Sequence, residues 1–230
     1  MLVMAGSSDG SEKWRTSDWQ ALLRSALTLI DTIEGNVSWS FGGGTALAVQ
    51  LAHRISYDID IFIPNADTVT ELSPHANPAT RALLGGRKYE FPGGYLKLKL
   101  DAGEIDFIVG GKRTADPNRP WHFEGRDILI ETPWEIAIKK LFYRPSTFKV
   151  RDIFDLAAIV ETQAEKLSPF VSIVADKLDK AIDRISLVLP SYEERALDDV
   201  NSTDLGRKYA TKAAAQSVLD FLKEHQSEKT

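Results

Sequence analysis

The clearest alternation of apolar and polar residues lies in SYDIDIFIP, residues 56–64. Side chains on a strand alternate between its two faces, so three isoleucines share one face while Asp58 and Asp60 share the other. We expect a strand here that ends at Pro64. Two carboxylates on one face repel each other, and the plain alternative to a functional role is an exposed strand edge whose acids are solvated.

A second alternating region predicts a β-hairpin. YLKLKL at residues 95–100 and EIDFIV at residues 104–109 both alternate with a period of two, and the DAG segment between them fits a turn. A shorter strand is expected at WSF, residues 39–41, just before a run of three glycines.

Apolar residues spaced three and four apart predict helices. One should span residues 17–35, with Ser17 as its N-cap and Gly35 at its end, and another should span residues 45–54. From about residue 131 the helical pattern dominates, beginning with Thr132 as a cap and Pro133 at the first helical position. The remaining helices are expected at residues 149–163, 169–185 and 204–225.

The order of these elements divides the chain in two. We expect an α+β fold, in which residues 1–126 form a small mixed β-sheet with flanking helices and residues 127–230 form an all-helical domain. Residues 1–16 are polar and are expected to be mobile. A substrate would suit a cleft between the two domains.

The composition limits the chemistry that is available. Of 230 residues, 43% are hydrophobic and 27% are charged, as in an ordinary globular protein. The chain has no cysteine and four scattered histidines, which excludes disulfides, thiolate metal sites and a cysteine nucleophile, so any metal must be held by oxygen. We find neither a secretory leader nor an apolar run of about 18 residues, and we expect a cytoplasmic protein with no membrane partner.

Charge is distributed unevenly along the chain. The formal net charge is −5, yet residues 81–151 carry 14 lysines and arginines against 9 acids. This basic third is compatible with a local anionic partner, although ordinary solvated faces would give the same count.

The predicted hairpin adds a third carboxylate to the pair in residues 56–64. Asp106 shares a strand face with Glu104, opposite the apolar side chains of its strand. If the two strands are neighbours, Asp58, Asp60 and Asp106 converge, and such oxygen ligands suit Mg²⁺ or Mn²⁺. The alternative is that the hairpin turns Asp106 to solvent.

The glycine run predicts a phosphate-binding turn. Gly42, Gly43 and Gly44 allow the backbone to approach a ligand, and a helix that opens at Thr45 would present free N–H groups and a positive dipole end. Glycines alone are weak evidence, but beside two aspartates they would place phosphate donors next to metal ligands.

These motifs occur together with others in a specific order. The set comprises Gly43-Gly44-Thr45-Ala46-Leu47, His53-Arg54, Ser56, Asp58-Ile59-Asp60, Lys140, and Arg151-Asp152 with Asp155-Leu156. It resembles the signature of the AbiEii-type nucleotidyltransferase toxins, a branch of the DNA polymerase β-like nucleotidyltransferase superfamily. The resemblance covers roughly residues 36–160, and the last 70 residues are similar only in being helical.

The resemblance implies transfer of a nucleoside monophosphate from an NTP to an acceptor. The implied catalytic residues are Asp58, Asp60, Lys140 and Asp152, in which Asp152 orients Lys140 or touches the nucleotide. The implied nucleotide-binding residues are Gly43, Gly44, Thr45, Arg54, Ser56, Lys140 and Asp155. The implied metal ligands are Asp58 and Asp60, and the strand pattern adds Asp106 as a third.

Several of these residues have ordinary structural alternatives. Lys139 and Lys140 could form the solvated edge of an amphipathic helix, and because neighbours on a helix point about 100° apart, we expect only one of them to face the cleft. His53 is expected to be structural. Trp121 and Trp134 could stack on a base or belong to the core.

The sequence leaves three functional hypotheses. The leading one is a Mg²⁺-dependent nucleotidyltransferase, the toxin of a toxin–antitoxin pair, which has a cognate antitoxin as partner. It uses an NTP to modify an RNA such as tRNA, or else a protein hydroxyl. A catalytically silent relative that binds a nucleotide or a partner protein is the second. The third is a nucleotidyltransferase that modifies a small molecule such as an aminoglycoside.

Overall fold

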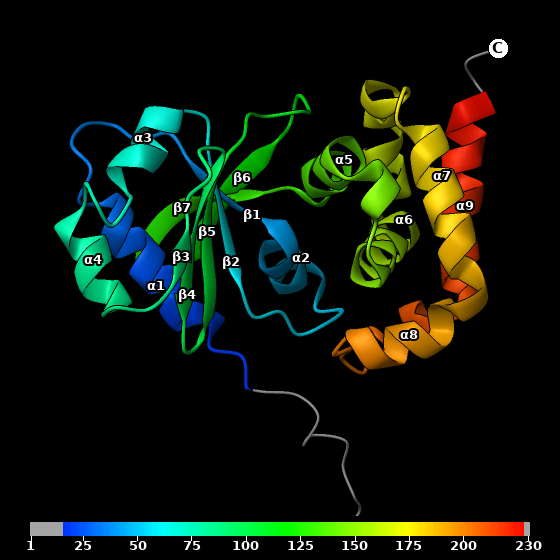
Figure 1. Ribbon diagram of the computed structural model, residues 1–230. Coiled ribbons are helices and arrows are strands. Elements are labelled where there is room, and N and C mark those ends of the chain that lie inside the picture. Colours follow the sequence, from blue (N-terminus) through cyan, green and yellow to red (C-terminus); the bar gives the residue numbers. More distant parts are fainter. Residues whose placement is uncertain (1–15, 228–230) are drawn as a thin grey trace, which may run out of the picture.

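The computed structural model describes residues 16–227 (Figure 1). The expectation of mobility for the first residues concerns a part of the chain outside this range. The described residues form a mixed sheet with flanking helices, followed by a group of packed helices, which confirms the predicted α+β class.

Seven strands form the sheet that the described residues contain, in the order β3-β4-β5-β2-β1-β7-β6. Their bounds are β1 Ser40–Gly42, β2 Ile59–Ile63, β3 Tyr89–Glu90, β4 Tyr95–Leu100, β5 Gly103–Val109, β6 Asn118–Phe123 and β7 Arg126–Glu131. The pairs β2–β5 and β1–β7 are parallel and the other pairs are antiparallel. The expected hairpin is confirmed as β4–β5, and the expected strands at residues 39–41 and 56–64 are confirmed as β1 and β2.

The hairpin β6–β7 was not expected from the sequence. Pro120 and exposed polar residues interrupt the alternation in β6, which lies at the edge of the sheet where a missing N–H is tolerated. Strand β7 runs to Glu131 and pairs with both β1 and β6, so residues 126–131 belong to the sheet.

Helices surround the sheet and build the second half of the chain. Around the sheet lie α1 Trp19–Ile30, α2 Gly43–Leu51, α3 Ala66–Glu71 and α4 Pro78–Leu84. The second half contains α5 Pro133–Tyr143, α6 Val150–Val171, α7 Leu178–Val188, α8 Tyr192–Asp199 and α9 Lys212–Ser227. Figure 1 shows α2 between the sheet and this helical half.

Three helix starts can be compared with the prediction: one is confirmed and two differ from it. The Thr132 hydroxyl accepts the Glu135 N–H, with Pro133 at the first helical position, as expected. Ser17 is not a cap: its hydroxyl donates to the carbonyl of Ser56, and Asp18 occupies the N-cap position of α1. Helix α2 begins at Gly43, earlier than predicted, so the glycines themselves form its first turn.

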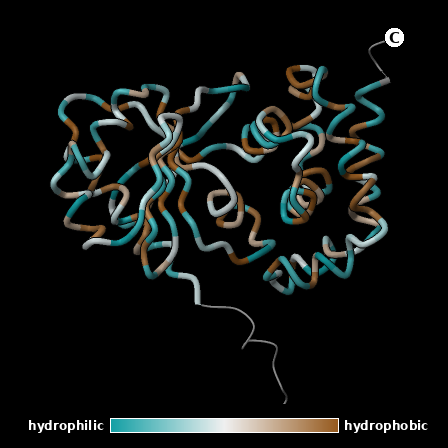
Figure 2. Tube along the Cα trace, in the orientation of Figure 1, coloured by the Kyte–Doolittle hydropathy of each residue, from teal (hydrophilic) through white to brown (hydrophobic). Residues whose placement is uncertain are grey.

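The buried face of the sheet is the isoleucine face that the alternation predicted. Ile59, Ile61 and Ile63 have no exposed surface, and α1 packs against β2 and β5. Figure 2 shows hydrophobic segments concentrated along the strands and the facing sides of the helices. The opposite face of β2 presents its polar residues toward α2 and α5.

Candidate functional site

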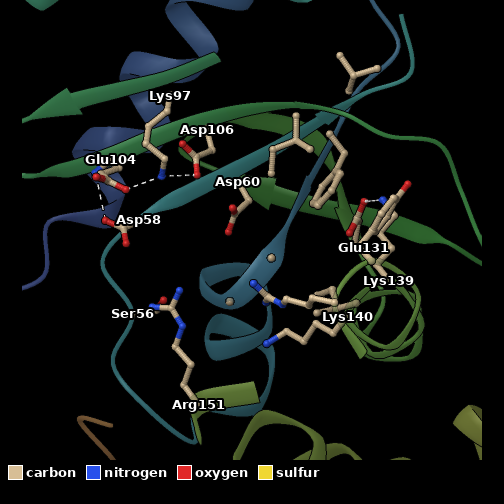
Figure 3. Close-up of a pocket in the computed structure, with 18 of the residues that line it drawn as sticks. Ser56, Asp58, Asp60, Lys97, Glu104, Asp106, Glu131, Lys139, Lys140 and Arg151 are labelled. Atoms are coloured by element: carbon tan, nitrogen blue, oxygen red, sulfur yellow. Dashed lines mark hydrogen bonds and ion pairs between the residues drawn. The ribbon is translucent and has the colours of Figure 1, made fainter. Parts of the chain in front are cut away.

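A cavity of about 400 Å³ lies between that polar face of the sheet, the start of α2 and one side of α5 (Figure 3). Its lining joins residues from both halves of the chain. It is lined by Gly43, Gly44, Arg54, Ser56, Asp58, Asp60, Phe62, Lys97, Glu104, Asp106, Ile108, Val109, Glu131, Ile136, Lys139, Lys140, Tyr143, Arg144 and Arg151.

The sheet supplies an acidic wall. In the parallel pairing of β2 with β5, Asp60 lies directly beside Asp106, which confirms that the two predicted strands are neighbours. Asp106 does not turn to solvent: it lines the cavity, and its Oδ2 accepts from Lys97 Nζ at 2.8 Å. Lys97 also binds Glu104, at 2.5 Å.

Burial makes this wall unfavourable for charge. It raises the pKa of Asp60, and Asp58 raises it further, while Arg144 acts in the opposite direction. Burial and then the neighbouring Asp60 raise the pKa of Asp106 to about 6. The Oδ1 atom of Asp106 is buried and has no hydrogen-bond partner among the described residues. A positive group in the cavity would relieve both effects.

The three aspartates that were expected to converge, Asp58, Asp60 and Asp106, all line this cavity. Between residues 16 and 227, no three histidine, cysteine, aspartate or glutamate side chains form a group that could hold a metal ion. Asp58 lies just before β2, and its Oδ1 accepts the backbone N–H of Glu104 at 3.1 Å. Asp106 is bound to Lys97, so two of the three aspartates have partners within the protein.

The first turn of α2 lies against Asp60. Gly43 has φ +69°, and a Cβ there would overlap the Asp60 carboxylate. A Cβ on Gly44 would overlap the Arg54 guanidinium. The backbone of the glycine turn therefore fits closely between an aspartate and an arginine, and its free N–H groups border the cavity.

Opposite the carboxylates, a buried network holds two cations at the cavity wall. Asp155 is fully buried and accepts from Arg54 Nε at 2.6 Å, from Arg54 Nη2 at 3.0 Å and from Lys140 Nζ. Although burial would raise the pKa of Asp155, Arg54 and Lys140 hold it well below its ordinary value. His53 Nε2 lies 2.8 Å from the same carboxylate, which gives His53 the structural role expected for it.

Asp152 extends this network. It is fully buried and accepts from Lys140 Nζ at 2.9 Å and from Arg144 Nη2 at 2.8 Å. Neither Asp152 nor Asp155 lines the cavity. Their position allows them to orient cations, which is one of the two roles that the resemblance left open for Asp152.

Thr45 also lies behind the wall. Its side chain is 1% exposed and hydrogen-bonds to Ser56 Oγ and to the Asp58 carbonyl. Of these three residues, Ser56 and Asp58 line the cavity. Thr45 thus fixes two lining residues, and its hydroxyl is engaged within the protein.

Both adjacent lysines of α5 line the cavity, so the expectation that only one would do so is wrong. Neither is at a solvated edge, since Lys139 is 5% and Lys140 7% exposed. Lys139 Nζ bonds Glu131 Oε1 at 2.5 Å and lies 3.7 Å from the centre of the Phe62 ring. Because the cavity wraps around one side of α5, side chains that diverge by about 100° can both reach it.

The cavity lining also includes charged residues that were not among the predicted site residues, and three of them bear on its charge balance. Arg144 and Arg151 add positive charge to the helical wall, and Glu131 adds an acid at the end of β7. Arg151 stood in the family pattern without a role. The signal for Arg144 was its position shortly after Lys140, at the end of the predicted helix.

The C-terminal half fixes the segment that carries Arg54. Arg54 forms an antiparallel bridge with Ser202, and the Ile55 N–H donates to the Asn201 carbonyl at 2.8 Å. The Thr203 N–H donates to the His53 carbonyl at 3.2 Å. A segment nearly 150 residues away in sequence therefore positions a cation of the cavity.

The large aromatic residues considered for base stacking lie elsewhere. Trp121 packs in a cluster with Trp19, Phe41 and Phe123, and Trp134 Nε1 donates to the Asp116 carbonyl at 2.8 Å. Neither tryptophan lines the cavity.

Comparisons with known proteins place the chain in a family. Residues 27–225 match the family model described as "Nucleotidyl transferase AbiEii toxin, Type IV TA system". No curated protein matches the chain. Two crystal structures match the chain, one of a proposed nucleotidyltransferase from H. pylori and one of JHP933 from Helicobacter pylori. Each shares 14% sequence identity with this chain and has a TM-score of 0.47. Each match covers 93% of this chain, together with 97% of the first structure's chain and 94% of the second's. The family match spans most of the chain, and the protein therefore belongs to the AbiEii nucleotidyltransferase toxin family of type IV toxin–antitoxin systems.

Proposed function

We propose that this nucleotidyltransferase uses a divalent cation, Mg²⁺ or Mn²⁺, to transfer a nucleoside monophosphate from an NTP to a hydroxyl of an RNA such as tRNA. Membership of the family implies an NTP substrate and a cognate antitoxin. The observation that carries the proposal is one cavity in which the carboxylates of the sheet lie opposite the cations Arg54 and Lys140.

The acidic wall suits a hard cation. Its donors are carboxylate oxygens, which Mg²⁺ and Mn²⁺ prefer, and the buried Oδ1 of Asp106 has no hydrogen-bond partner among residues 16–227. Asp58 and Asp60 would hold the ion, and Asp106 lies beside Asp60. When bound, the ion would supply charge stabilisation for the transferring phosphoryl group.

The opposite wall suits the triphosphate. Arg54, Lys140, Arg144 and Arg151 border the cavity, and the two buried aspartates behind them leave an excess of positive charge. The N–H groups at the start of α2 add a positive dipole end between the two walls. Nucleotidyl transfer depends mainly on positioning and on charge stabilisation, and these residues provide both.

An RNA acceptor is supported less directly. The basic strand face that would guide RNA consists of Lys97 and Lys99, and in the structure Lys97 binds Glu104 and Asp106 while Lys99 binds Glu90. These lysines would have to exchange acidic partners for phosphates. The RNA proposal therefore predicts that RNA binding weakens with ionic strength and weakens further in the Lys97→Ala/Lys99→Ala variant.

The test is to incubate the protein with each labelled NTP, Mg²⁺ and either total RNA or total protein, and to identify the labelled product. Asp60→Ala should lower transfer about 100-fold or more, because it removes a principal electrostatic group. Activity of Asp60→Ala within about tenfold of wild type would refute the metal assignment. Label in protein or small molecules, with none in RNA, would refute the RNA acceptor and leave nucleotidyl transfer standing.

Among the described residues, no helix is long and apolar enough to cross a membrane.

A further inference from the structure

The cavity continues past its carboxylates into an apolar half. Along β2 the residues that face the cavity change from Asp60 to Phe62, and along β5 they change from Asp106 to Ile108. The two strands are parallel and in register, so Phe62 lies beside Ile108 just as Asp60 lies beside Asp106. The cavity lining therefore changes from acidic to apolar at the same position along both strands.

Helix α5 repeats this division on the facing side. Ile136, Lys139, Lys140 and Tyr143 line the cavity with the spacing of one helix face, and Arg144, just past the end of the helix, lines it too. Lys140 and Arg144 belong to the buried ion network, whereas Ile136 and Tyr143 complete the apolar half.

Tyr143 is an aromatic side chain that is held in place yet accessible. It is 50% exposed, and its hydroxyl accepts from Arg113 Nη2 at 2.9 Å. The Arg113 guanidinium in turn stacks 3.7 Å from the centre of the Phe142 ring. The Arg113 backbone N–H donates to the buried carboxylate of Glu135 at 2.9 Å, which ties this loop to the first turn of α5. Exposing a large aromatic ring to water is unfavourable, and a ring that is fixed in the lining of a cavity can stack on a planar ligand.

The inner end of the apolar half carries hydrogen-bonding groups. Glu131 is 1% exposed, and its Oε2 has no hydrogen-bond partner among residues 16–227, although its Oε1 binds Lys139 and Ser40. An unpartnered buried oxygen is costly, so a ligand that offers an N–H to Glu131 would gain from it. Lys139 beside it is a donor.

Resting on the proposed function, we infer that the apolar half binds the nucleobase of the NTP, with Tyr143 as its stacking surface and Glu131 and Lys139 at its edge. A strand rises about 3.3 Å per residue, so Phe62 lies about 7 Å beyond Asp60, a distance that a ribose can span between a phosphate and its base. A planar ring with N–H and acceptor atoms on its edge matches this lining, whereas the polyphosphate matches the charged half.

The experiment separates the base from the triphosphate. Calorimetric titrations would compare the α,β-methylene analogues of ATP, GTP, CTP and UTP with inorganic tripolyphosphate, each in the presence of Mg²⁺. Wild type should bind at least one nucleotide analogue more tightly than tripolyphosphate. Tyr143→Ala should weaken that nucleotide about tenfold, the usual effect of losing one base–aromatic stack, and should leave tripolyphosphate binding unchanged.

Two further variants control the result. Tyr143→Phe keeps the ring but loses the hydrogen bond from Arg113, so it should retain most of the nucleotide affinity. Tyr89→Ala removes a tyrosine outside the cavity, which hydrogen-bonds His75, and should change neither affinity.

Each contrary outcome has a distinct meaning. Equal binding of nucleotides and tripolyphosphate by wild type, or equal weakening of both by Tyr143→Ala, overturns the nucleobase site while the proposed function stands. If wild type binds neither ligand, the proposed function fails and the nucleobase site fails with it.

Discussion

Replacing Glu131 by glutamine should remove a decline in stability that the wild type shows as the pH rises from about 5 to about 8. Glu131 is buried between the sheet and α5, where its Oε1 accepts from Lys139 Nζ at 2.5 Å and from Ser40 Oγ at 3.0 Å. Glu135, a second buried acid, lies 3.5 Å from the same lysine. The ion pair with Lys139 favours the charged form of the Glu131 carboxyl, whereas burial favours its neutral form.

Burial has the larger effect and raises the pKa of Glu131 from 4.5 to about 7. The folded state therefore holds the proton over a pH range in which the unfolded chain has released it. Stability is greatest below the unfolded pKa and falls as the pH rises toward the folded pKa. At about 1.4 kcal/mol per pKa unit, the whole difference amounts to about 3 kcal/mol, most of which is lost between pH 5 and pH 8.

The measurement is the free energy of unfolding in urea at several pH values, for wild type and Glu131→Gln. The difference between the two proteins should change by about 2–3 kcal/mol over this range, in favour of the variant at high pH. Glu34→Gln, at an exposed position, is the control and should follow the wild type. A constant difference between wild type and Glu131→Gln would show that the ion pair with Lys139 outweighs burial and would refute the reasoning.

Two other substitutions test the frame of the site. Gly43→Ala should lower stability by about 1–2 kcal/mol because residue 43 has a positive φ, and it should also strongly reduce transfer because the new Cβ would displace Asp60. Gly35→Ala is the control: residue 35 has φ +90° and no atom within 4 Å of an added Cβ, so this variant should lose stability without losing transfer activity. Asp155→Asn should lower stability by about 3–5 kcal/mol in thermal or urea unfolding, since it leaves Arg54 and Lys140 without their shared buried carboxylate. Equal activities of the two glycine variants, or an Asp155→Asn protein as stable as wild type, would contradict these assignments.

The sequence by itself determined the elements that depend on short-range patterns. Period-two alternation is a property of neighbouring residues, so it located β2 and the β4–β5 hairpin and separated the isoleucine face from the face of Asp60. Capping chemistry is equally local, and Thr132 with Pro133 fixed the start of α5. Edge strand β6 gave no such signal, because an edge position tolerates Pro120 and exposed polar residues.

The candidate site was predictable in its residue types and only partly in its geometry. The motif order placed Asp58, Asp60 and Lys140 in one site, and all three line the cavity. The directions of the Asp58 and Asp106 side chains depend on where strand β2 begins and on which partner each carboxylate binds. The motif does not determine either of these. Asp58 therefore turned to the Glu104 N–H and Asp106 to Lys97.

Only the tertiary structure decided what the last part of the chain contributes. Arg54 is held by Asp155 and by a bridge to Ser202, contacts that join residues about 100 and 150 positions apart. Such pairings depend on how the helical half packs against the sheet, and no local propensity encodes them. The same packing brings Tyr143 and Glu131 to one cavity with Asp60, because α5 and β7 meet β2 only after the chain has folded.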